Sequence, residues 1–293
     1  MENGNGRSLS GMYGSVCNFL RRCLFRVLSY GPIPKHIAFI MDGNRRFARS
    51  RNLKEGVGHR VGFMALMSIL QYCYELGVKY VTVYAFSIDN FNRKPDEVQY
   101  VMDLMQEKIE ELIKEESIVN KYGIKINFFG NLNLLNEPVR RAAERAIAAT
   151  AGNTQAVFSV CVAYTSTDEI VHSVNESCIE KRASIRQVNL NSNGASDNNS
   201  EIEYLEGDNL GACVISLADL ERHMYTAGCP DPDILIRTSG EARLSNFLLW
   251  QTTFCYLLAP DALWPEISLR HLVWAVLEYQ HVQPYLEKKK KQL

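Results

Sequence analysis

The sequence predicts an α/β fold, in which helices cover a mostly parallel β-sheet, and one large domain. Short apolar runs rich in β-branched and aromatic residues alternate with longer stretches of helical periodicity. The chain has 293 residues, of which 46% are hydrophobic and 22% charged, the balance of a globular protein. A chain of this length can bury a sizeable core.

Residues 1–30 predict a separate amphipathic helix. Its apolar positions follow helical spacing, with Arg21, Arg22 and Arg26 toward the other side. The apolar positions are Met12, Val16, Phe19, Leu20, Cys23, Leu24 and Val27. The pattern favours equally a helix on a membrane surface and one docked on the domain or on a partner. The arginine pair interrupts the apolar stretch, which disfavours a cleaved signal.

The main domain is expected over residues 31–287. Its predicted strands are 36–41, 80–86, 125–130, 158–164 and 234–239. Residues 61–76 predict a buried helix, and the stretch from Val98 to Ile113 predicts a longer helix with one apolar stripe. Asn136 is a predicted N-cap before Pro138, opening a helix that runs to Thr150.

Two segments depart from this pattern. Residues 181–212 are rich in Asn, Ser and Gly and predict a mobile surface insertion. Residues 288–293 form a basic tail, typical of a solvated end, that is also suited to touching anionic lipid.

Charge and cysteine content narrow the function classes. A net charge of -1 gives no overall attraction to nucleic acid, so any anion must be recognised by locally clustered basic residues. The eight cysteines have no zinc-type spacing, and a reducing compartment fits them best. Residues 146–167 lack charge, but the polar segment 152–155 argues against a membrane span, and we expect a soluble body.

The first segment predicted to carry functional residues is HIAFIMDGNRRFA, residues 36–48. A buried strand leads directly into Asp42 and Gly43, followed by Arg45 and Arg46. In α/β sheets ligands bind at the carboxyl ends of strands, where a glycine lets backbone N–H groups approach a phosphate. Magnesium is usually held by one or two carboxylates plus substrate phosphates, which suits a single Asp beside arginines. Alone, Asp42 would more often be an Asx-turn cap, and the paired arginines favour the anion site.

Two further strands end in polar side chains. In residues 80–98 these are Ser87, Asn90, Arg93 and Glu97. The alternative there is that Asp96 and Glu97 only complement the dipole of a helix that begins at Pro95. In residues 232–251 they are Arg237, Glu241, Arg243 and Ser245, around Gly240. Two arginines across a turn make a fork for phosphate oxygens, although an Arg243–Glu241 ion pair is the simpler interpretation of a surface loop.

Four segments, in this order and spacing, resemble the signature segments of the cis-prenyltransferases: HIAFIMDGNRRFA, AFSIDNFNR, FSVCVAYTSTDEI and IRTSGEARLSNFLLWQ. The resemblance covers roughly residues 30–286 and is greatest to eukaryotic, plant-type dehydrodolichyl diphosphate synthase catalytic subunits and their rubber-synthase relatives. It implies a six-stranded parallel sheet with a hydrophobic product tunnel. It also implies Mg²⁺-dependent condensation of isopentenyl diphosphate onto an allylic diphosphate such as farnesyl diphosphate.

The resemblance also implies roles for individual residues. Asp42 would be the essential carboxylate for magnesium, with Asn90 and Arg93 as further catalytic residues. The allylic diphosphate site would comprise Gly43, Asn44, Arg45, Arg46 and His59. The isopentenyl diphosphate site would comprise Arg237, Arg243 and Ser245. Phe91 matches a closing loop, and Glu97 opens the tunnel helix. The proton acceptor is either the substrate diphosphate or Asn90.

The apolar stripe from Val98 to Ile113 becomes a candidate tunnel wall, although core packing would give the same stripe. In similar enzymes a longer helix here accompanies longer products, and the span from Glu97 to Ile124 is long. We therefore expect a long polyprenyl product for dolichol synthesis.

Three departures from the family pattern stand out. Glu55 replaces a phosphate-binding Arg of many relatives, and Ala242 and Tyr256 replace metal ligands of bacterial homodimers. The sequence ends in KKKKQL rather than with the Arg-x-Gly of single-subunit relatives. The resemblance then implies a membrane-bound, Nogo-B-receptor-like partner that supplies Arg-x-Gly, and a peripheral location on the cytosolic face of the endoplasmic reticulum.

The sequence lacks the features of several rival classes of protein. A non-catalytic partner subunit of the same fold would lose the Asp-Gly-Asn-Arg and Arg-Thr-Ser-Gly segments that are intact here. A kinase or nucleotide-binding protein would show GxxxxGK[ST] or GxGxxG, and a trans-prenyltransferase would show DDxxD, and none of these occurs. A shorter-chain or rubber-type cis-prenyltransferase stays open.

Overall fold

A computed structural model describes residues 5–192 and 214–292. It contains a six-stranded, all-parallel sheet with strand order β3-β4-β2-β1-β5-β6, which confirms the predicted fold class. The strands are β1 His36–Ile40, β2 Tyr80–Ser87, β3 Ile124–Phe129, β4 Ala156–Tyr164, β5 Ile234–Arg237 and β6 Tyr256–Leu258. The five predicted runs all form strands. Edge strand β6 was not predicted, because three residues are too short to show a periodic pattern.

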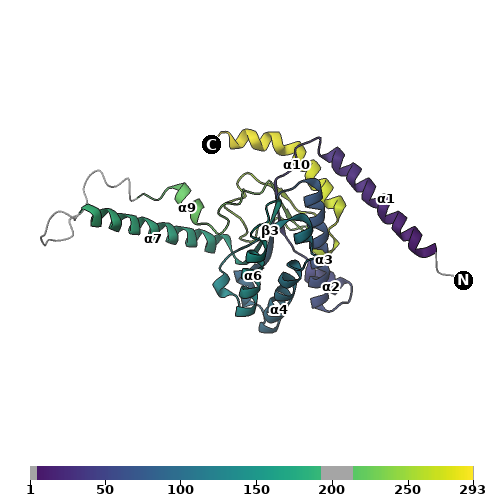
Figure 1. The fold of residues 1–293 in the computed structure, drawn as a ribbon, viewed down its shortest axis with the longest axis horizontal. Coiled ribbons are helices and arrows are strands. Elements are labelled where there is room, and N and C mark those ends of the chain that lie inside the picture. Colours follow the sequence, from purple (N-terminus) through teal and green to yellow (C-terminus); the bar gives the residue numbers. More distant parts are fainter. Residues whose placement is uncertain (1–4, 193–213, 293) are drawn as a thin grey trace.

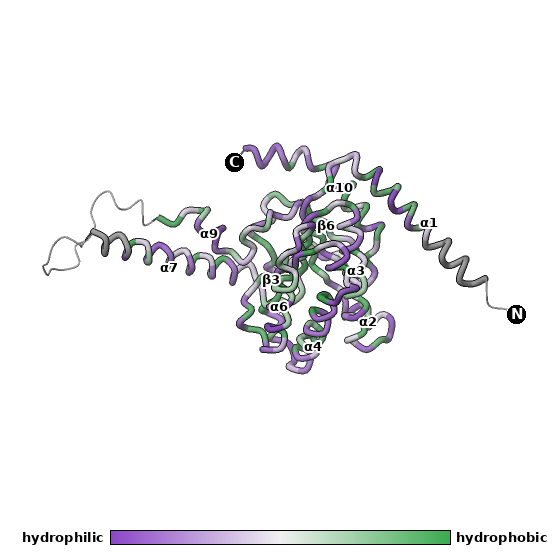
Figure 2. Tube along the Cα trace, in the orientation of Figure 1, coloured by the Kyte–Doolittle hydropathy of each residue, from purple (hydrophilic) through white to green (hydrophobic). Residues whose placement is uncertain are grey.

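Both faces of the sheet are buried, which explains why its strands are continuous apolar runs. Along β1, Ile37 and Phe39 point into the larger core cluster, while Ala38 and Ile40 point into a smaller cluster on the other face. Side chains alternate in this way because successive residues of a strand face opposite sides. Figure 2 shows the hydrophobic segments gathered at the centre of the molecule.

Helices surround the sheet in the described parts of the chain. They are α1 Asn5–Leu28, α2 Asn44–Ser50, α3 Glu55–Leu76, α4 Pro95–Leu112, α5 Ile118–Tyr122, α6 Glu137–Thr150, α7 Ser166–Ser192, α9 Leu217–His223 and α10 Leu269–Lys290. Short 3-10 helices lie at η1 Ile88–Asn92, η2 Leu132–Leu134 and η3 Trp264–Glu266. In Figure 1, α7 and α9 project from the body as an arm, and α1 runs along the opposite side.

Helix α1 docks on the body through its C-terminal half. Phe25 and Leu28 are buried in the core, and the Arg21 guanidinium donates to the Glu75 carboxylate of α3 at 2.8 Å. The side chains of Val16, Phe19, Leu20 and Val27 face away from the body and are between 54% and 65% exposed. One face of α1 is therefore docked and its apolar stripe is left uncovered by the described residues.

Three boundaries differ from the sequence-based expectation. Residues 181–192 belong to α7 and not to a loop, and the rest of the predicted insertion, 193–212, lies outside the described residues. The expected long span from Glu97 to Ile124 is divided, because α4 ends at Leu112 and Ser117 caps the separate helix α5 through the Asn120 N–H. Lys288–Lys290 form the last turn of α10.

The predicted N-cap of the helix that ends at Thr150 is confirmed. Asn136 caps α6, since its Oδ1 accepts from the Val139 N–H at 3.2 Å, and the helix begins at Glu137. No helix in the described part of the chain combines the length and apolarity needed to cross a membrane.

Candidate active site

A cavity of about 540 Å³ opens at the carboxyl ends of β1, β2 and β5 and continues between α3 and α4. Its mouth is polar and its depth is apolar. The polar lining residues are Asp42, Asn44, Arg45, His59, Ser87, Asp89, Asn90, Arg93, Lys108, Arg237, Arg243 and Ser245. The apolar lining comes from the sheet and from both helices, and includes Phe63, Leu66, Val83, Met105, Ile109, Leu112 and Phe158. Such a cavity suits an amphiphile with an anionic head.

The Asp42 carboxylate stands at the mouth of this cavity between two arginines. Arg237 Nη2 donates to Asp42 Oδ2 at 2.9 Å, and Arg46 Nη2 lies 3.4 Å from Asp42 Oδ1. Partial burial alone would raise the pKa of Asp42, but the hydrogen bond and charge of Arg237, aided by Arg46, lower it below its usual value. Asp42 is thus a carboxylate held in its charged form.

The main chain of Asp42 is also fixed. Its carbonyl oxygen accepts from the Trp264 N–H at 2.9 Å and from the Thr238 hydroxyl at 2.6 Å. The N-cap position of α2 is held by Gly43 and has no side-chain cap, so the alternative of Asp42 as a helix cap is wrong. The side chain is left for interactions at the cavity.

Gly43 makes the sharp turn from β1 into α2. Its φ of 109° lies in the left-handed region, and a Cβ there would come within 3.0 Å of the Leu263 Cβ. The next residue, Asn44, donates to the Met41 carbonyl at 3.3 Å, while its Oδ1 is buried without a partner among the described residues. Gly62 of α3 packs against that oxygen, because a Cβ on Gly62 would lie 2.2 Å from it.

Arg237 links Asp42 to the third polar segment. It is 6% exposed, and its Nη1 donates to the Arg243 carbonyl at 2.5 Å and to Ser245 Oγ at 2.6 Å. Ser245 has a φ of 48°, so the loop bends back toward Arg237 at this point. The Arg243 side chain is 63% exposed and pairs with Glu241, which is the ion pair predicted as the simpler interpretation of this loop. Arg243 also lines the cavity.

The second polar segment closes one side of the mouth. Asn90 Oδ1 accepts from the Ser87 N–H at 3.2 Å, and Phe91 packs on Phe86 with ring centroids 4.9 Å apart. Glu97 in the first turn of α4 accepts from Arg93 at 3.0 Å and from Arg45 at 3.3 Å. Glu97 therefore joins this segment to α2, in addition to complementing the dipole of α4.

A buried polar cluster supports the loop that carries Ser245. The fully buried Glu169 of α7 accepts from the Tyr164 hydroxyl at 2.5 Å, from the Thr226 hydroxyl at 2.8 Å and from Gln251 Nε2 at 3.0 Å. Burial is the main reason that the pKa of Tyr164 is raised far above its usual value, with the charge of Glu169 as a further cause. This cluster holds β4, α7 and the segment after Ser245 together.

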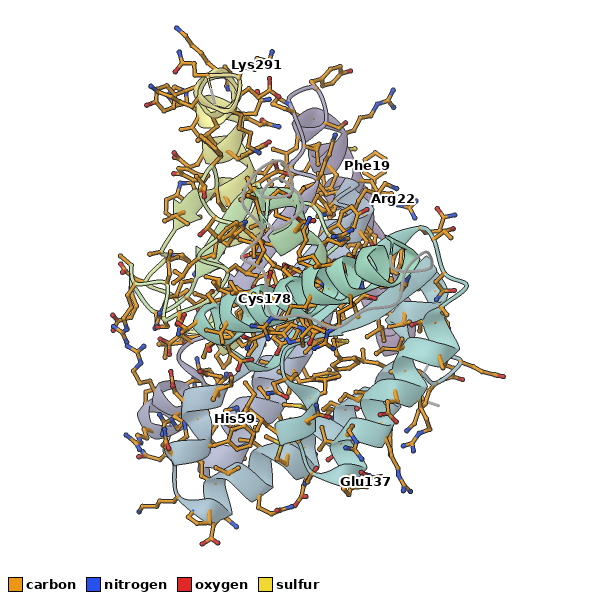
Figure 3. The ribbon with its side chains drawn as sticks, turned by 90° about the vertical axis from the view of Figure 1, so that its left-hand side faces the viewer. Phe19, Arg22, His59, Glu137, Cys178 and Lys291 are labelled. Atoms are coloured by element: carbon orange, nitrogen blue, oxygen red, sulfur yellow. The ribbon has the colours of Figure 1, made fainter. Side chains whose placement is uncertain are left out.

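The structure thus brings most of the predicted site residues around one cavity. Four predicted site residues do not line it, namely Gly43, Arg46, Phe91 and Glu97. Arg46 contacts the lining through Asp42, and Glu97 through Arg45 and Arg93. His59 lines the cavity at one end of the molecule, whereas Phe19 and Arg22 of α1 lie toward the other end (Figure 3). Sequence reasoning missed Trp264, Thr238 and Lys108, because their roles arise from packing between distant segments.

The positions that depart from the family pattern lie apart from the cavity lining. Ala242 is exposed, and the Tyr256 hydroxyl is 3.5 Å from Glu278. The side chain of Glu55 lies outside the described residues. Among the described residues no three His, Cys, Asp or Glu side chains cluster as metal ligands. Asp42 is a single carboxylate that pairs with Arg46 and Arg237.

A second, wider hollow of about 920 Å³ lies between α2, the end of β6 and α10. Two of its charged lining residues, Arg51 and Glu266, pair with each other at 3.2 Å. It lacks the apolar depth of the first cavity, which makes it the weaker candidate for an amphiphilic substrate.

Comparison with known proteins identifies the family of the chain. The family model described as "Putative undecaprenyl diphosphate synthase" matches residues 40–286. A dehydrodolichyl diphosphate synthase of Solanum lycopersicum is 57% identical over all of both chains. A rubber cis-polyprenyltransferase of Hevea brasiliensis is 54% identical, again over the whole of both chains.

More distant relatives extend the comparison. The human dehydrodolichyl diphosphate synthase complex subunit is 39% identical over 89% of this chain and 72% of its own. The crystal structure of lavandulyl diphosphate synthase from Lavandula x intermedia, in complex with dimethylallyl diphosphate, superposes with a TM-score of 0.68. It is 27% identical and covers 85% of this chain and 95% of its own. The chain therefore belongs to the cis-prenyltransferase family.

Proposed function

We propose that this chain is the catalytic subunit of a plant-type dehydrodolichyl diphosphate synthase. It would condense isopentenyl diphosphate repeatedly onto farnesyl or another allylic diphosphate, in cis configuration, to give a long polyprenyl diphosphate for dolichol synthesis. The observation that carries this proposal is the Arg237–Asp42 pair at the mouth of a deep apolar cavity. Cations and a carboxylate recognise a metal-bound diphosphate, and the cavity receives its hydrocarbon chain.

The allylic diphosphate belongs on the α2 side of this pair. Arg45 and His59 line the cavity there, Arg46 flanks Asp42, and Gly43 brings the N-terminal N–H groups of α2 close to the mouth. Guanidinium groups bind phosphate oxygens in pairs, and a helix N-terminus favours anions. The Asn44 side chain donates to the Met41 carbonyl and packs against Gly62, which fixes this turn.

The isopentenyl diphosphate belongs on the opposite side, with Arg237, Arg243 and Ser245. The Arg243 side chain is exposed and its partner Glu241 offers only an exchangeable surface ion pair. A diphosphate can therefore replace Glu241 at little cost. The two substrates then meet across Asp42 and Arg237.

The residues present fit a magnesium ion. Asp42 is a single charged carboxylate at the mouth, and Mg²⁺ takes one or two carboxylates with substrate phosphates and water as its remaining ligands. When bound, the ion would neutralise charge that develops on the leaving diphosphate.

Prenyl transfer breaks the allylic C1–O bond and forms a C–C bond from the isopentenyl double bond to C1. Negative charge grows on the departing diphosphate, where Arg45, Arg46 and the N–H groups of α2 stabilise it without reorganising. The attack leaves positive charge on isopentenyl C3, and loss of a proton from C2 then forms the new double bond between C2 and C3. Asn90 is an amide whose Oδ1 already accepts from Ser87, so a phosphate oxygen is the acceptor.

Two alternatives are distinguishable. A non-catalytic scaffold subunit has no need for the Arg237–Asp42 ion pair or for the hydrogen bond from Arg237 to Ser245. A rubber-type enzyme is the second candidate, favoured by the identity to the Hevea protein, and the length of the products decides between it and dolichol synthesis.

A membrane partner completes the proposed enzyme, as the human relative is named a complex subunit. Leu257 of edge strand β6 and Trp274 and Leu277 of α10 are between 44% and 50% exposed, and they offer an apolar surface for it. A Nogo-B-receptor-like subunit seated here would bring its Arg-x-Gly toward the isopentenyl diphosphate. Leu257→Asp and Trp274→Asp should each reduce recovery of such a partner at least tenfold in co-purification, whereas Met64→Asp on α3 should not.

We further propose that α1 seats the enzyme on the cytosolic face of the endoplasmic reticulum. Its apolar stripe is uncovered, and the exposed Arg22 and Arg26 flank it. The basic last turn of α10, purple in Figure 2, lies at the same end of the molecule as the C-terminal end of α1. Phe19→Asp should lower co-sedimentation with phosphatidylserine-containing vesicles several-fold, with Met64→Asp as the matched control. Equal binding by both variants would refute this role.

The function itself is tested by incubating the chain, alone and with a candidate partner, with farnesyl diphosphate, labelled isopentenyl diphosphate and Mg²⁺. We expect labelled polyprenol after dephosphorylation, with the higher yield when the partner is present. A lack of labelled lipid in both mixtures would overturn the proposal.

A further inference from the structure

The cavity is too small for the product that the proposed function requires. An isoprene unit fills on the order of 100 Å³ at the packing density of a protein interior, so about 540 Å³ holds roughly five units. A growing chain that passes this length must leave the cavity while its diphosphate head stays at Asp42. The place where it leaves is a property of the cavity walls.

The deep end of the cavity is closed by the protein core. Ile109 and Leu112 of α4 are 4% and 5% exposed, and Phe158 of β4 is 1% exposed. Moving any of them would open a void in a close-packed interior, which is costly. A chain that leaves through this end would have to disrupt the main hydrophobic core.

The side wall between α3 and α4 is built differently. Phe63 of α3 and Lys108 of α4 both line the cavity, and the Lys108 ammonium lies 5.0 Å from the centre of the Phe63 ring. The same ammonium pairs with Glu111 at 2.6 Å and with Glu107 at 3.2 Å, and its side chain is 17% exposed. Lys108 therefore touches the cavity with its stem and reaches solvent with its charge.

Ion pairs at the surface hold this wall together. Arg60 of α3 pairs with Glu107 of α4 at 3.1 Å, and both side chains are about half exposed. Exposed ion pairs of this kind contribute little to stability and exchange readily with water. The wall at Lys108 is thus the part of the cavity that yields to a growing hydrocarbon chain with the smallest loss of packing.

We propose that Lys108 guards a side opening between α3 and α4 through which the polyprenyl chain leaves the cavity, and that it thereby sets product length. This inference rests on the proposed function. Swinging of the Lys108 stem away from Phe63 opens the wall, and the charge, held by Glu107 and Glu111, keeps the side chain from folding into the apolar space. Lys108 acts on the position of the chain end and takes no part in the bond changes.

The test compares product lengths in the full enzyme, with its partner where required, using farnesyl diphosphate and labelled isopentenyl diphosphate. Lys108→Trp fills the opening, and we expect the main product to shorten toward the roughly five units that the cavity holds. Lys108→Met keeps the stem without the charge, and we expect a smaller shift in the same direction. Lys114→Trp, exposed beyond the end of α4, is the matched control and should give wild-type lengths.

Leu112→Ala distinguishes growth of the chain against the closed end of the cavity from its departure through the side opening. It enlarges the closed end, so it lengthens the product only if chains stop growing against that end. Wild-type lengths from both Lys108 variants, or a longer product from Leu112→Ala, would overturn the side opening. If Lys108→Trp fails to fold, as judged by its melting transition, Lys108→Met decides. A wild-type enzyme that makes no product refutes the proposed function instead.

Discussion

The Arg237 guanidinium donates to the Asp42 carboxylate at 2.9 Å and thereby joins two segments that are 195 residues apart in the sequence. The neighbouring strands β1 and β5 make this contact possible, since Ile40 of β1 is in register with Arg237 of β5. Parallel strands end at the same edge of a sheet, so side chains that follow them converge. The pair defines the boundary between the two proposed diphosphate sites.

Arg237→Lys should therefore lower kcat/KM by about 10²–10³-fold. A lysine ammonium cannot reach Asp42, Ser245 and the Arg243 carbonyl at once, as the planar guanidinium does. Steady-state kinetics check this, with the exposed Arg141→Lys as control. A loss of less than threefold would show that the fork geometry is unimportant.

Asp42 should make stability depend on pH in acid. The arginines lower its pKa below 3.8 in the folded protein, so its charge stabilises the fold above that pH, and the contribution is lost as the pH falls through the lowered pKa. Urea unfolding of the wild type and Asp42→Asn should differ most at neutral pH and converge as the pH falls through the lowered pKa of Asp42. Asp103→Asn controls for the general acid response. A difference that does not change with pH would contradict the ion pair.

Two glycines with similar backbone angles allow the cost of a left-handed backbone to be measured apart from the cost of a steric clash. Gly43 and Gly77 have φ of 109° and 101°, but a Cβ would clash with Leu263 at the first and would meet nothing within 4 Å at the second. Gly77→Ala should cost only the roughly 1–2 kcal/mol of the left-handed backbone. Gly43→Ala should cost more and abolish turnover, because the turn that carries Asp42 must move. Equal losses of unfolding free energy with full activity in both would refute this.

Glu169→Ala should destabilise the fold by about 3 kcal/mol, because it leaves buried donors without an acceptor. Tyr164, Thr226 and Gln251 all donate to this carboxylate. Denaturant unfolding measures the effect, and Glu144→Ala, which has a 62% exposed side chain, should change stability by less than about 0.5 kcal/mol. A neutral effect of Glu169→Ala would mean that the cluster relaxes or is hydrated.

Much of this architecture could be predicted from local sequence. Strands such as β1 and β5 are apolar on both faces, and polar residues directly after them mark the carboxyl edge of the sheet. The order of these strands could not be derived from local patterns, because pairing depends on contacts across the chain. The same holds for Trp264, which fixes the Asp42 carbonyl from 222 residues away, and for Lys108, whose periodicity alone suggests only a solvated position.

Local patterns also misjudged where helices end. The apolar stripe of α4 continues to Ile113, yet the helix ends at Leu112, since Ser117 starts a new cap for α5. In α1, the amphipathic pattern did not distinguish docking from an exposed surface. The helix has both, because Phe25 and Leu28 lie on a different side from Phe19 and Val27.

The central claim, two adjacent diphosphate sites with different substrates, is tested most directly by the two Michaelis constants of Arg243→Ala. Arg243 lies on the isopentenyl side and is exposed, so its loss should leave the fold intact. We expect the KM for isopentenyl diphosphate to rise by at least tenfold, about 1.4 kcal/mol, while the KM for farnesyl diphosphate stays within twofold. An equal rise in both constants, or a rise for farnesyl diphosphate alone, would contradict the assignment.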